Sequence, residues 1–482
     1  MFKQRLSRRH WLGYSCAAGA ATLWGAGGCE QSSDKSTPAK PSEPVTLRVL
    51  VVDDVPLGEA IQREWHARTE NHVTIDAVTR EKLAQASRLP GDVIVFPAAL
   101  LGQLVERSLI RPLDEPLLAS ESVALQDILP LTRRDEIRWG GKTYALPLGS
   151  PQLVLAYRPD LFARLDLKPP TSWDEYQAAA VKLADRSSLG DAAPTANQPW
   201  RATAEPIGPG FGGALLLARA AGYASHPDQR TPLFETPKLD PLIDRPPFVR
   251  ALTELVASLR TSDLPPVASP VDAMGELLAG RCAMAMGWPG SQPAAPGAEV
   301  PNIAFAELPC SREVFHFRHS QWQKRPADEF ERIPLLGIAG RFAAVASSSG
   351  HVSAAEGLVG WLAGSEVSSR IGPASNGAAP FRASQRTFLK QWVGSLPAEA
   401  AEQYFHVVQQ TQSRARSMST VRLPGSDRYL SALDTAVQRA VEGQDPLESL
   451  RQAAEQWRKI TAELGPAAQR AALDHSLGSE AD

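Results

Sequence analysis

The sequence has few cysteines, no long apolar run after its N-terminus and no complete catalytic motif. Four cysteines occur among 482 residues, so the chain is not a disulfide-dense scaffold. After residue 28, no apolar stretch approaches the roughly 18 residues expected of a membrane-spanning helix. The formal net charge is −3 and no basic run follows the N-terminus, so no nucleic-acid partner is expected. The Gly-x-Ser-x-Gly motif of esterases is absent.

Two partial motifs lack the context that their chemistry needs. Residues 140–143 resemble the end of a phosphate-binding loop, but position 136 is Glu where that loop requires Gly. The spacing of Cys310, His316 and His319 fits no common zinc site. The sequence therefore predicts a protein that is not an enzyme and that binds no metal or cofactor.

The N-terminus carries two targeting signals. Residues 7–13 read Ser-Arg-Arg-His-Trp-Leu-Gly and resemble a twin-arginine export signal. Small residues then lead to Ala-Gly-Gly-Cys at positions 26–29, which resembles a lipobox. We therefore predict a signal peptide over residues 1–28 and a lipid on Cys29. The alternative is a Sec signal peptide cleaved at the same place without lipidation.

The composition after the signal predicts a tether followed by two domains. Residues 29–44 are mostly Ser, Lys, Pro and Thr and cannot bury a core, so we expect a flexible tether. The remaining residues are too many for one core. Export permits a disulfide between Cys282 and Cys310, and two free buried thiols are the alternative. The predicted location is the periplasm or extracytoplasmic face, with a lipid anchor in the membrane.

Alternating strand and helix patterns open the first domain. Apolar, β-branched runs predict strands over residues 46–52, 73–78 and 92–96. Helical patterns cover residues 58–68 and 100–107 between and after them. This alternation predicts a parallel sheet with crossover helices.

Capping signals mark three later helices. Residues 172–175 and 353–356 each read as a capping box, in which a Ser hydroxyl and a Glu carboxylate satisfy free backbone amides. Asp445 caps a last helix with a clear apolar stripe, which ends at Gly465. We expect the tail, residues 466–482, to be frayed.

A series of short segments occurs in a recognisable order along the chain. The segments are 139–147, 159–162, 169–176, 248–255, 278–286, 376–382 and 423–426. Their order resembles that of extracellular solute-binding proteins of bacterial ABC importers, in the sugar-binding branch similar to maltose-binding protein. The similarity covers nearly everything from Val45 to Gly465.

The resemblance implies an α/β, two-lobe periplasmic-binding-protein-like fold with discontinuous lobes joined by crossing hinge strands. Lobe one would comprise residues 45–147 and 334–380. Lobe two would comprise residues 150–309 and 384–465. Ligand would bind in the cleft between them, which agrees with the rule that α/β sheets bind ligands beyond their strands' carboxyl ends.

The implied function is solute binding for import. The protein would bind a small solute, with a carbohydrate as the leading expectation, and deliver it to an ABC permease. It would act as a monomer held at the membrane by the lipid on Cys29. The alternatives are a sensor or scaffold for another envelope protein and an exported hydrolase.

Three candidate solute contacts follow predicted strands. Asp53 and Asp54 end the first strand, where carboxylates would accept hydrogen bonds from sugar hydroxyls. The alternative for both is a helix cap or a solvated turn. Trp288 follows the strand within residues 278–286, at a position where relatives often place a stacking aromatic. Its alternative is a core position.

Four further candidates are tied to the crossings and to lobe two. Ser150 and Gln152 lie in the first crossing segment and would donate to solute or satisfy the hinge backbone. Phe211 would line lobe two or anchor a buried loop, and Arg382 lies near the last crossing. Residues 97–99 are Pro-Ala-Ala where many relatives have a polar residue, so the ligand differs from a maltose-like sugar if that contact matters.

The lipid assignment predicts that Cys29→Ala releases the protein from the membrane. The variant lacks the thiol that carries the acyl chains, and the rest of the chain has no other long apolar run. Cell fractionation followed by immunoblotting measures this. A variant that stays in the membrane fraction would show that the lipid assignment is wrong.

Overall fold

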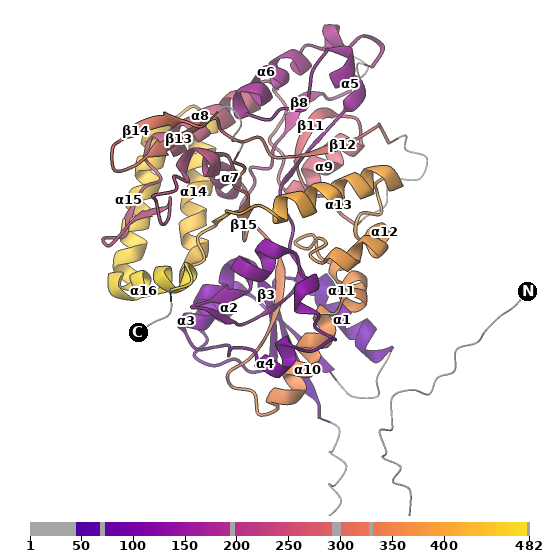
Figure 1. Ribbon diagram of the computed structural model, residues 1–482, viewed down its shortest axis with the longest axis vertical. Helices are drawn as coiled ribbons and strands as arrows, with labels where there is room; N and C mark the ends of the chain where they lie inside the picture. The colour runs from indigo at the N-terminus through magenta and orange to yellow at the C-terminus, as the bar shows by residue number, and fades with distance from the viewer. Residues whose placement is uncertain (1–44, 68–72, 193–197, 292–299, 327–330, 480–482) are drawn as a thin grey trace, which may run out of the picture. The chain divides into compact units, whose positions relative to one another are not determined.

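The chain builds two α/β lobes, each around its own sheet (Figure 1). The computed structural model describes residues 45–67, 73–192, 198–291, 300–326 and 331–479. The predicted signal peptide, Cys29 and the predicted tether lie outside the described residues. Within those described ranges, no helix has the length and apolar character needed to cross a bilayer.

Lobe one contains a five-stranded sheet. Its strands are β1 (Leu47–Val52), β2 (Val73–Val78), β3 (Val93–Pro97), β6 (Leu146–Gly149) and β16 (Arg341–Val345). The order is β2-β1-β3-β16-β6. As predicted, β1 pairs in parallel with β2 and β3, whereas the late strand β16 runs antiparallel to β3 and β6. Its helices are α1 (Val55–His66), α2 (Arg80–Gln85), α3 (Leu101–Glu106), α4 (Glu115–Leu118), α10 (Val352–Ala363) and α11 (Ser365–Ile371).

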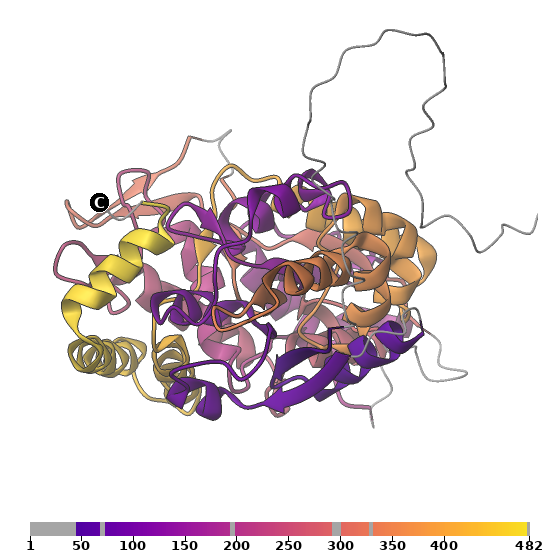
Figure 2. The same ribbon diagram turned by 90° about the horizontal axis from the view of Figure 1, so that it is seen from below.

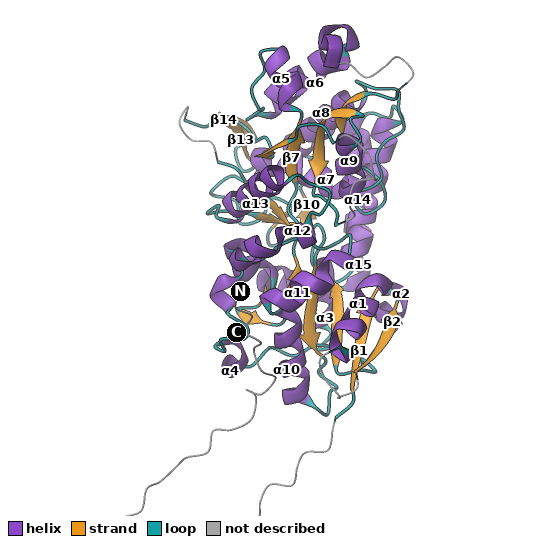
Figure 3. Cartoon of the chain, turned by 90° about the vertical axis from the view of Figure 1, so that its right-hand side faces the viewer, coloured by secondary structure: helices purple, strands orange, loops and turns teal. Residues whose placement is uncertain are grey.

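Lobe two contains a four-stranded sheet in the order β12-β7-β11-β8. The strands are β7 (Val154–Tyr157), β8 (Arg201–Ala204), β11 (Cys282–Gly287) and β12 (Ala304–Glu307). β7 runs antiparallel to β11 and β12, and β11 runs parallel to β8. Figure 3 shows the strands of the two lobes as separate groups covered by helices. The helices are α5 (Pro159–Arg164), α6 (Trp173–Ala184), α7 (Gly212–Ala224), α8 (Pro246–Leu259), α9 (Pro270–Leu278), α12 (Leu389–Trp392), α13 (Ala398–Gln412), α14 (Ser426–Val441) and α15 (Pro446–Leu464).

Short strand pairs complete the fold. They are β4 (Arg138–Trp139) with β5 (Lys142–Thr143), β9 (Phe234–Glu235) with β10 (Asp240–Pro241), β13 (Glu313–His316) with β14 (Gln321–Lys324), and β15 (Leu335–Leu336) with β17 (Met418–Ser419). The β4–β5 hairpin contains the segment that resembles a phosphate loop, and its turn uses positive φ angles at Gly140 and Gly141. The β15–β17 pair is parallel and joins two segments that cross between the lobes.

Two of the three predicted helix caps are confirmed. The Ser172 hydroxyl accepts from the Glu175 amide at 3.3 Å, and Asp445 accepts from the Glu448 amide at 2.9 Å. The capping box at 353–356 is wrong, because α10 begins at Val352 and Ser353 lies inside the helix. The Glu356 carboxylate instead accepts from the Asp114 amide at 3.1 Å, so a contact distant in sequence takes the group that a local cap would have used.

The two described cysteines are free. Cys282 and Cys310 are both buried thiols, so the disulfide alternative is not realised. Cys310 donates its thiol hydrogen to the carbonyl of Thr171 at 3.2 Å. Burial raises the pKa of the Cys310 thiol, which disfavours the reactive thiolate.

The segment after Gly465 is a helix rather than a frayed tail. α16 (Pro466–Ser476) begins with a proline in its first turn and buries Leu473. His475 Nδ1 lies 2.7 Å from Glu106 of α3, and the His475 carbonyl accepts from the Gly140 amide at 2.9 Å. Figure 2 shows this yellow helix beside the purple segments of lobe one. The four alanines of α16 favour a helix by themselves, and contacts with another part of the fold stabilise it further.

Leu473→Ala should lower the free energy of unfolding by about 2–3 kcal/mol, because it removes a buried leucine from this contact. Leu477→Ala is the matched control and should change it by less than about 0.5 kcal/mol. The two side chains are 5% and 39% exposed. Urea unfolding curves measure both, and equal small effects would show that the tail is frayed in solution.

Candidate functional site

The carboxyl ends of strands from both sheets face each other. β6 ends at Gly149 and β7 begins at Val154, so these neighbouring strand ends must meet across the gap between lobes. β1 and β3 end at the same sheet edge as β6, and β11 and β8 end beside the start of β7. Residues that follow these strands in the two lobes are therefore brought together.

The two predicted aspartates differ in their surroundings. Asp54 is 7% exposed and caps α1 by accepting from the Leu57 amide at 3.2 Å. Its second oxygen accepts from Arg341 at 2.6 Å and also from the Ser375 hydroxyl. Asp54 therefore has the cap role that was the alternative reading, together with an ion pair inside lobe one.

Asp53 belongs to a chain of charges that reaches lobe two. It has a positive φ of 49° and accepts from Arg80 Nε at 3.0 Å. Arg80 Nη1 donates to Asp427, in the first turn of α14, at 2.7 Å. The carboxylates of both lobes thus share one guanidinium.

Trp288 and Phe211 lie together on the lobe-two side. The Trp288 ring is 1% exposed and meets the half-buried Phe211 ring edge to face, with centroids 6.2 Å apart. The indole N–H donates to the carbonyl of Asn376 at 3.0 Å. Asn376 follows Ser375, which binds Asp54, so the backbone here links the tryptophan and the aspartate.

The two lobes are in contact around the residues described above. We call Asp53, Asp54, Phe211 and Trp288, with Arg80 and Arg341, the strand-end cluster. Besides Arg80–Asp427 and Trp288–Asn376, the Ser426 hydroxyl donates to the Ala99 carbonyl at 3.2 Å. The structure therefore has the lobes in direct contact at the predicted site, and no face of the Trp288 ring is available for stacking in this arrangement.

Ser150 belongs to a buried polar cluster at the crossings. Its hydroxyl donates to the Glu136 carboxylate at 2.5 Å, and Thr132 donates to the same oxygen at 2.7 Å. The Gly337 amide donates to the other oxygen at 3.0 Å. Burial raises the pKa of Glu136, and the three hydrogen bonds oppose that rise. Sequence reasoning missed Glu136, since no local motif marks a group that acts between distant segments.

Within the described residues, neither Gln152 nor Arg382 hydrogen-bonds to the strand-end cluster. Gln152 is buried, and its Nε2 has no partner within the described residues. Arg382 is buried in lobe one, where it donates to the carbonyls of Ala363 at 2.9 Å and Ala124 at 3.2 Å. Arg382 therefore joins the end of α10 to a neighbouring loop, and contact of either residue with solute stays a prediction.

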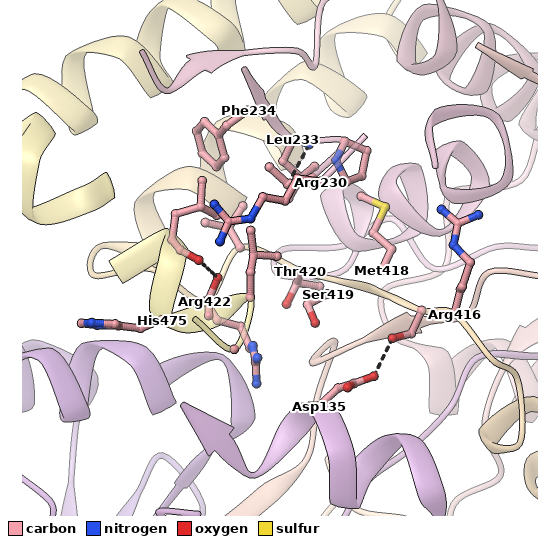
Figure 4. A pocket seen from close by; sticks show the side chains of 18 of the residues that line it. Asp135, Arg230, Leu233, Phe234, Arg416, Met418, Ser419, Thr420, Arg422 and His475 are labelled. Atoms are coloured by element: carbon pink, nitrogen blue, oxygen red, sulfur yellow. Dashed lines mark hydrogen bonds between the residues drawn. The ribbon is translucent and has the colours of Figure 1, made fainter. Parts of the chain in front are cut away.

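A separate cavity of about 610 Å³ lies between the lobes (Figure 4). Its wall comes from residues 134–141 of lobe one, 225–234 of lobe two, the crossing segment 415–423 and residues 473–478 of the tail. In Figure 4, Arg230 and Phe234 lie above the crossing segment and Asp135 lies below it. None of the seven predicted solute contacts lines this space, which we call the arginine cavity.

A histidine cluster shows hydrogen bonding that does not favour a metal. Possible ligand atoms of His226, Asp228 and His316 lie within 4.8 Å of one another. Each histidine accepts a backbone amide at Nδ1, from Asp228 at 3.1 Å and from His319 at 3.2 Å. In the neutral tautomer Nε2 then carries the proton and has no lone pair for a cation, and His226 Nε2 lies 3.1 Å from Gln323 Oε1, to which it donates.

Several solved structures share the fold. The solute-binding protein of Agrobacterium radiobacter K84 in complex with ribitol is 18% identical, with a TM-score of 0.63 over 87% of this chain and 100% of that chain. The protein of Agrobacterium vitis S4 with bound D-mannitol is 17% identical, with a TM-score of 0.62 over 87% and 99%. The sugar-binding protein MalE of Xanthomonas citri is 18% identical, with a TM-score of 0.60 over 87% and 98%. These likenesses establish the periplasmic-binding-protein fold.

The sequence decides the family. Residues 53–368 match the family profile described as bacterial extracellular solute-binding protein, which is more than half of the chain. The chain belongs to this family.

The predicted resemblance and two-lobe α/β fold are therefore confirmed. As a solute-binding protein, the molecule is a non-catalytic component of transport. Membership of this family draws attention to the strand-end cluster, because the two lobes are in contact there.

The buried Glu136 predicts a pH effect on this solute-binding protein. Burial raises its folded pKa above the usual 4.5, so at pH values between the unfolded and the folded pKa the folded state keeps a proton that the unfolded state has lost. The stabilisation that this extra proton gives the folded state is fully present below about pH 4.5, the unfolded pKa. It is lost as the pH rises through the higher pKa of the folded state. Glu136→Gln does not titrate, so its stability should fall less over this window.

Urea unfolding at a series of pH values from about 4 to 8 measures the difference between wild type and Glu136→Gln. Glu463→Gln is the control, because Glu463 is exposed on α15 and pairs with Arg428. The same pH slope in the wild type and in Glu136→Gln would contradict the raised pKa.

Proposed function

We propose that this protein binds a small polyhydroxylated solute, a sugar or polyol, between its lobes and delivers it to an ABC permease. The carrying observation is the strand-end cluster, in which Arg80 of lobe one pairs with Asp427 of lobe two and the Trp288 indole, packed on Phe211, donates to the Asn376 carbonyl of lobe one. Charged groups paired with hydroxyls and rings packed on C–H faces are the usual means of sugar recognition. The ribitol- and mannitol-bound neighbours support this class of solute.

The proposed mechanism is closure of the lobes on the solute. A solute favours closure only through contacts that it makes in the closed state alone. A change from mostly open to mostly closed requires about 5 kcal/mol of differential binding. A few hydrogen bonds at about 1 kcal/mol each and one or two ring contacts supply this amount. Trp288 and Phe211 would provide the ring contacts to the solute held between the closed lobes.

The lipid anchor completes the proposal. A lipid on Cys29 and a polar tether over residues 29–44 would hold the binding domain at the extracytoplasmic face, near its permease. The tether is long enough for the lobes to turn freely, because a coil of this length spans about 20 Å or more.

The first test is a solute panel. Ribitol, D-mannitol and maltose, with related hexoses and pentitols, should be titrated into the purified protein while its Tm is recorded. A ligand that binds only the folded state raises Tm by mass action. A rise with at least one sugar or polyol is expected, and no rise with any of them would show that the proposed solute class is wrong.

Trp288→Phe then tests the site. The change keeps an aromatic ring but removes the hydrogen bond to Asn376 across the lobes, so affinity for the solute should fall about fivefold. Trp457→Phe is the matched control, because Trp457 is also buried and donates its indole N–H to a carbonyl, that of Tyr429 within lobe two. The control should lose stability and keep its affinity. Equal affinities of Trp288→Phe and wild type would remove Trp288 from the site.

A further inference from the structure

The arginine cavity has no role in the proposed function, yet it has the size of a ligand site. Small-molecule pockets usually enclose about 300–1,000 Å³, and this cavity encloses about 610 Å³. It is lined by both lobes, a crossing segment and the tail, so an occupant would contact parts of the chain that are far apart in sequence.

The wall of the cavity is strongly cationic. Its only described carboxylate is that of Asp135, against five arginines. The arginines are Arg134, Arg138, Arg230, Arg416 and Arg422. Guanidinium groups stay charged at any physiological pH, so this excess does not depend on titration.

The carboxylates that pair with two of these arginines stand outside the wall. Arg230 donates to Asp474 at 2.7 Å, and Arg416 donates to Glu331 at 2.9 and 3.0 Å. Neither carboxylate lines the cavity, so the cationic members of both pairs are nearer to an occupant. A concave wall of one sign concentrates its field on the space it encloses.

Donors remain available on this wall. Within the described residues, Arg138 donates to the Gly141 carbonyl and pairs with no carboxylate. The Nε groups of Arg230 and Arg416 likewise make no hydrogen bond to a described residue. Leu233, Phe234 and Met418 line the same space and supply apolar contact.

We propose that the arginine cavity binds a small organic anion through a carboxylate or phosphate group. Arginine is the side chain best suited to both groups, because its planar N–H donors match their paired oxygens. The apolar side chains would contact the carbon skeleton. This site is separate from the strand-end cluster and does not depend on the proposed sugar specificity.

An occupant would also be linked to the solute site. Because both lobes line the cavity, an anion stabilises the arrangement of the lobes in which the wall is complete. Linkage between two sites is reciprocal. If a bound anion changes the affinity for solute by some factor, bound solute changes the affinity for the anion by the same factor.

Titration of the full-length protein with charged and neutral probes tests the proposal. D-gluconate, D-glucose 6-phosphate and inorganic phosphate are compared with neutral D-glucose at one ionic strength, by calorimetry and by Tm. Saturable binding of gluconate supports a carboxylate site, and binding of the phosphates supports a phosphate site. Either should weaken as sodium chloride is raised to about 0.5 M. No saturable binding of any of the three anions overturns the proposal.

Variants locate the anion. Arg138→Gln, at an exposed side chain, should weaken anion binding at least fivefold, and adding Arg230→Gln should weaken it at least tenfold. Arg386→Gln is the matched control, because Arg386 pairs with Glu402 on the surface outside the cavity, and it should bind as the wild type does. Undiminished anion binding in the double variant, or a loss in Arg386→Gln as large as that in the double variant, would overturn the proposal.

Discussion

The buried carboxylate of Glu136 holds together the passes of the chain between the lobes. Thr132 precedes it in lobe one, Ser150 lies in the first crossing and Gly337 in the second, and all three donate to it. Its backbone carbonyl accepts from Arg422, in a later crossing, at 2.9 Å. A buried carboxyl group is costly unless its hydrogen bonds are satisfied, so these segments are fixed relative to one another. The lobes can move only around this fixed centre.

The contacts beyond that centre are individually weak. The Arg80 and Asp427 side chains are 39% and 40% exposed, and ion pairs of this kind contribute about 0–1 kcal/mol. The hydrogen bonds from Trp288 and Ser426 across the lobes contribute about 1 kcal/mol each. Their sum of about 2–3 kcal/mol is smaller than the roughly 5 kcal/mol that separates mostly open from mostly closed populations. These contacts alone supply less than that difference, so the proposed mechanism needs the solute to supply the remainder.

Signals between neighbouring residues predicted local structure, but they did not predict contacts between residues far apart in sequence. The β-branched run at 46–52 and the cap at Ser172 depend on neighbouring residues, and both are confirmed. The box at 353–356 was predicted wrongly, because a contact distant in sequence takes its Glu356 carboxylate. The frayed tail was predicted wrongly over residues 466–476, where alanines favour a helix and His475 contacts the distant Glu106. The same limit of local signals applies to the candidate site. The sequence predicted polar and aromatic residues directly after the strands β1 and β11. Glu136 and the arginine cavity instead depend on segments far apart in sequence, which no spacing rule relates.

The tail adds a constraint to the motion of the lobes. α16 contacts lobe one through His475 and Glu106, and Glu106 also accepts from the Trp139 indole at 2.6 Å. It contacts lobe two through Asp474 and Arg230. A rotation that parts the lobes must strain one set of contacts or carry the helix with one lobe. Because each contact is worth about 1 kcal/mol or less, the tail raises the cost of opening without preventing it. Because both lobes line the arginine cavity, an opening of this kind would change its wall, and the two proposed sites would then be coupled energetically.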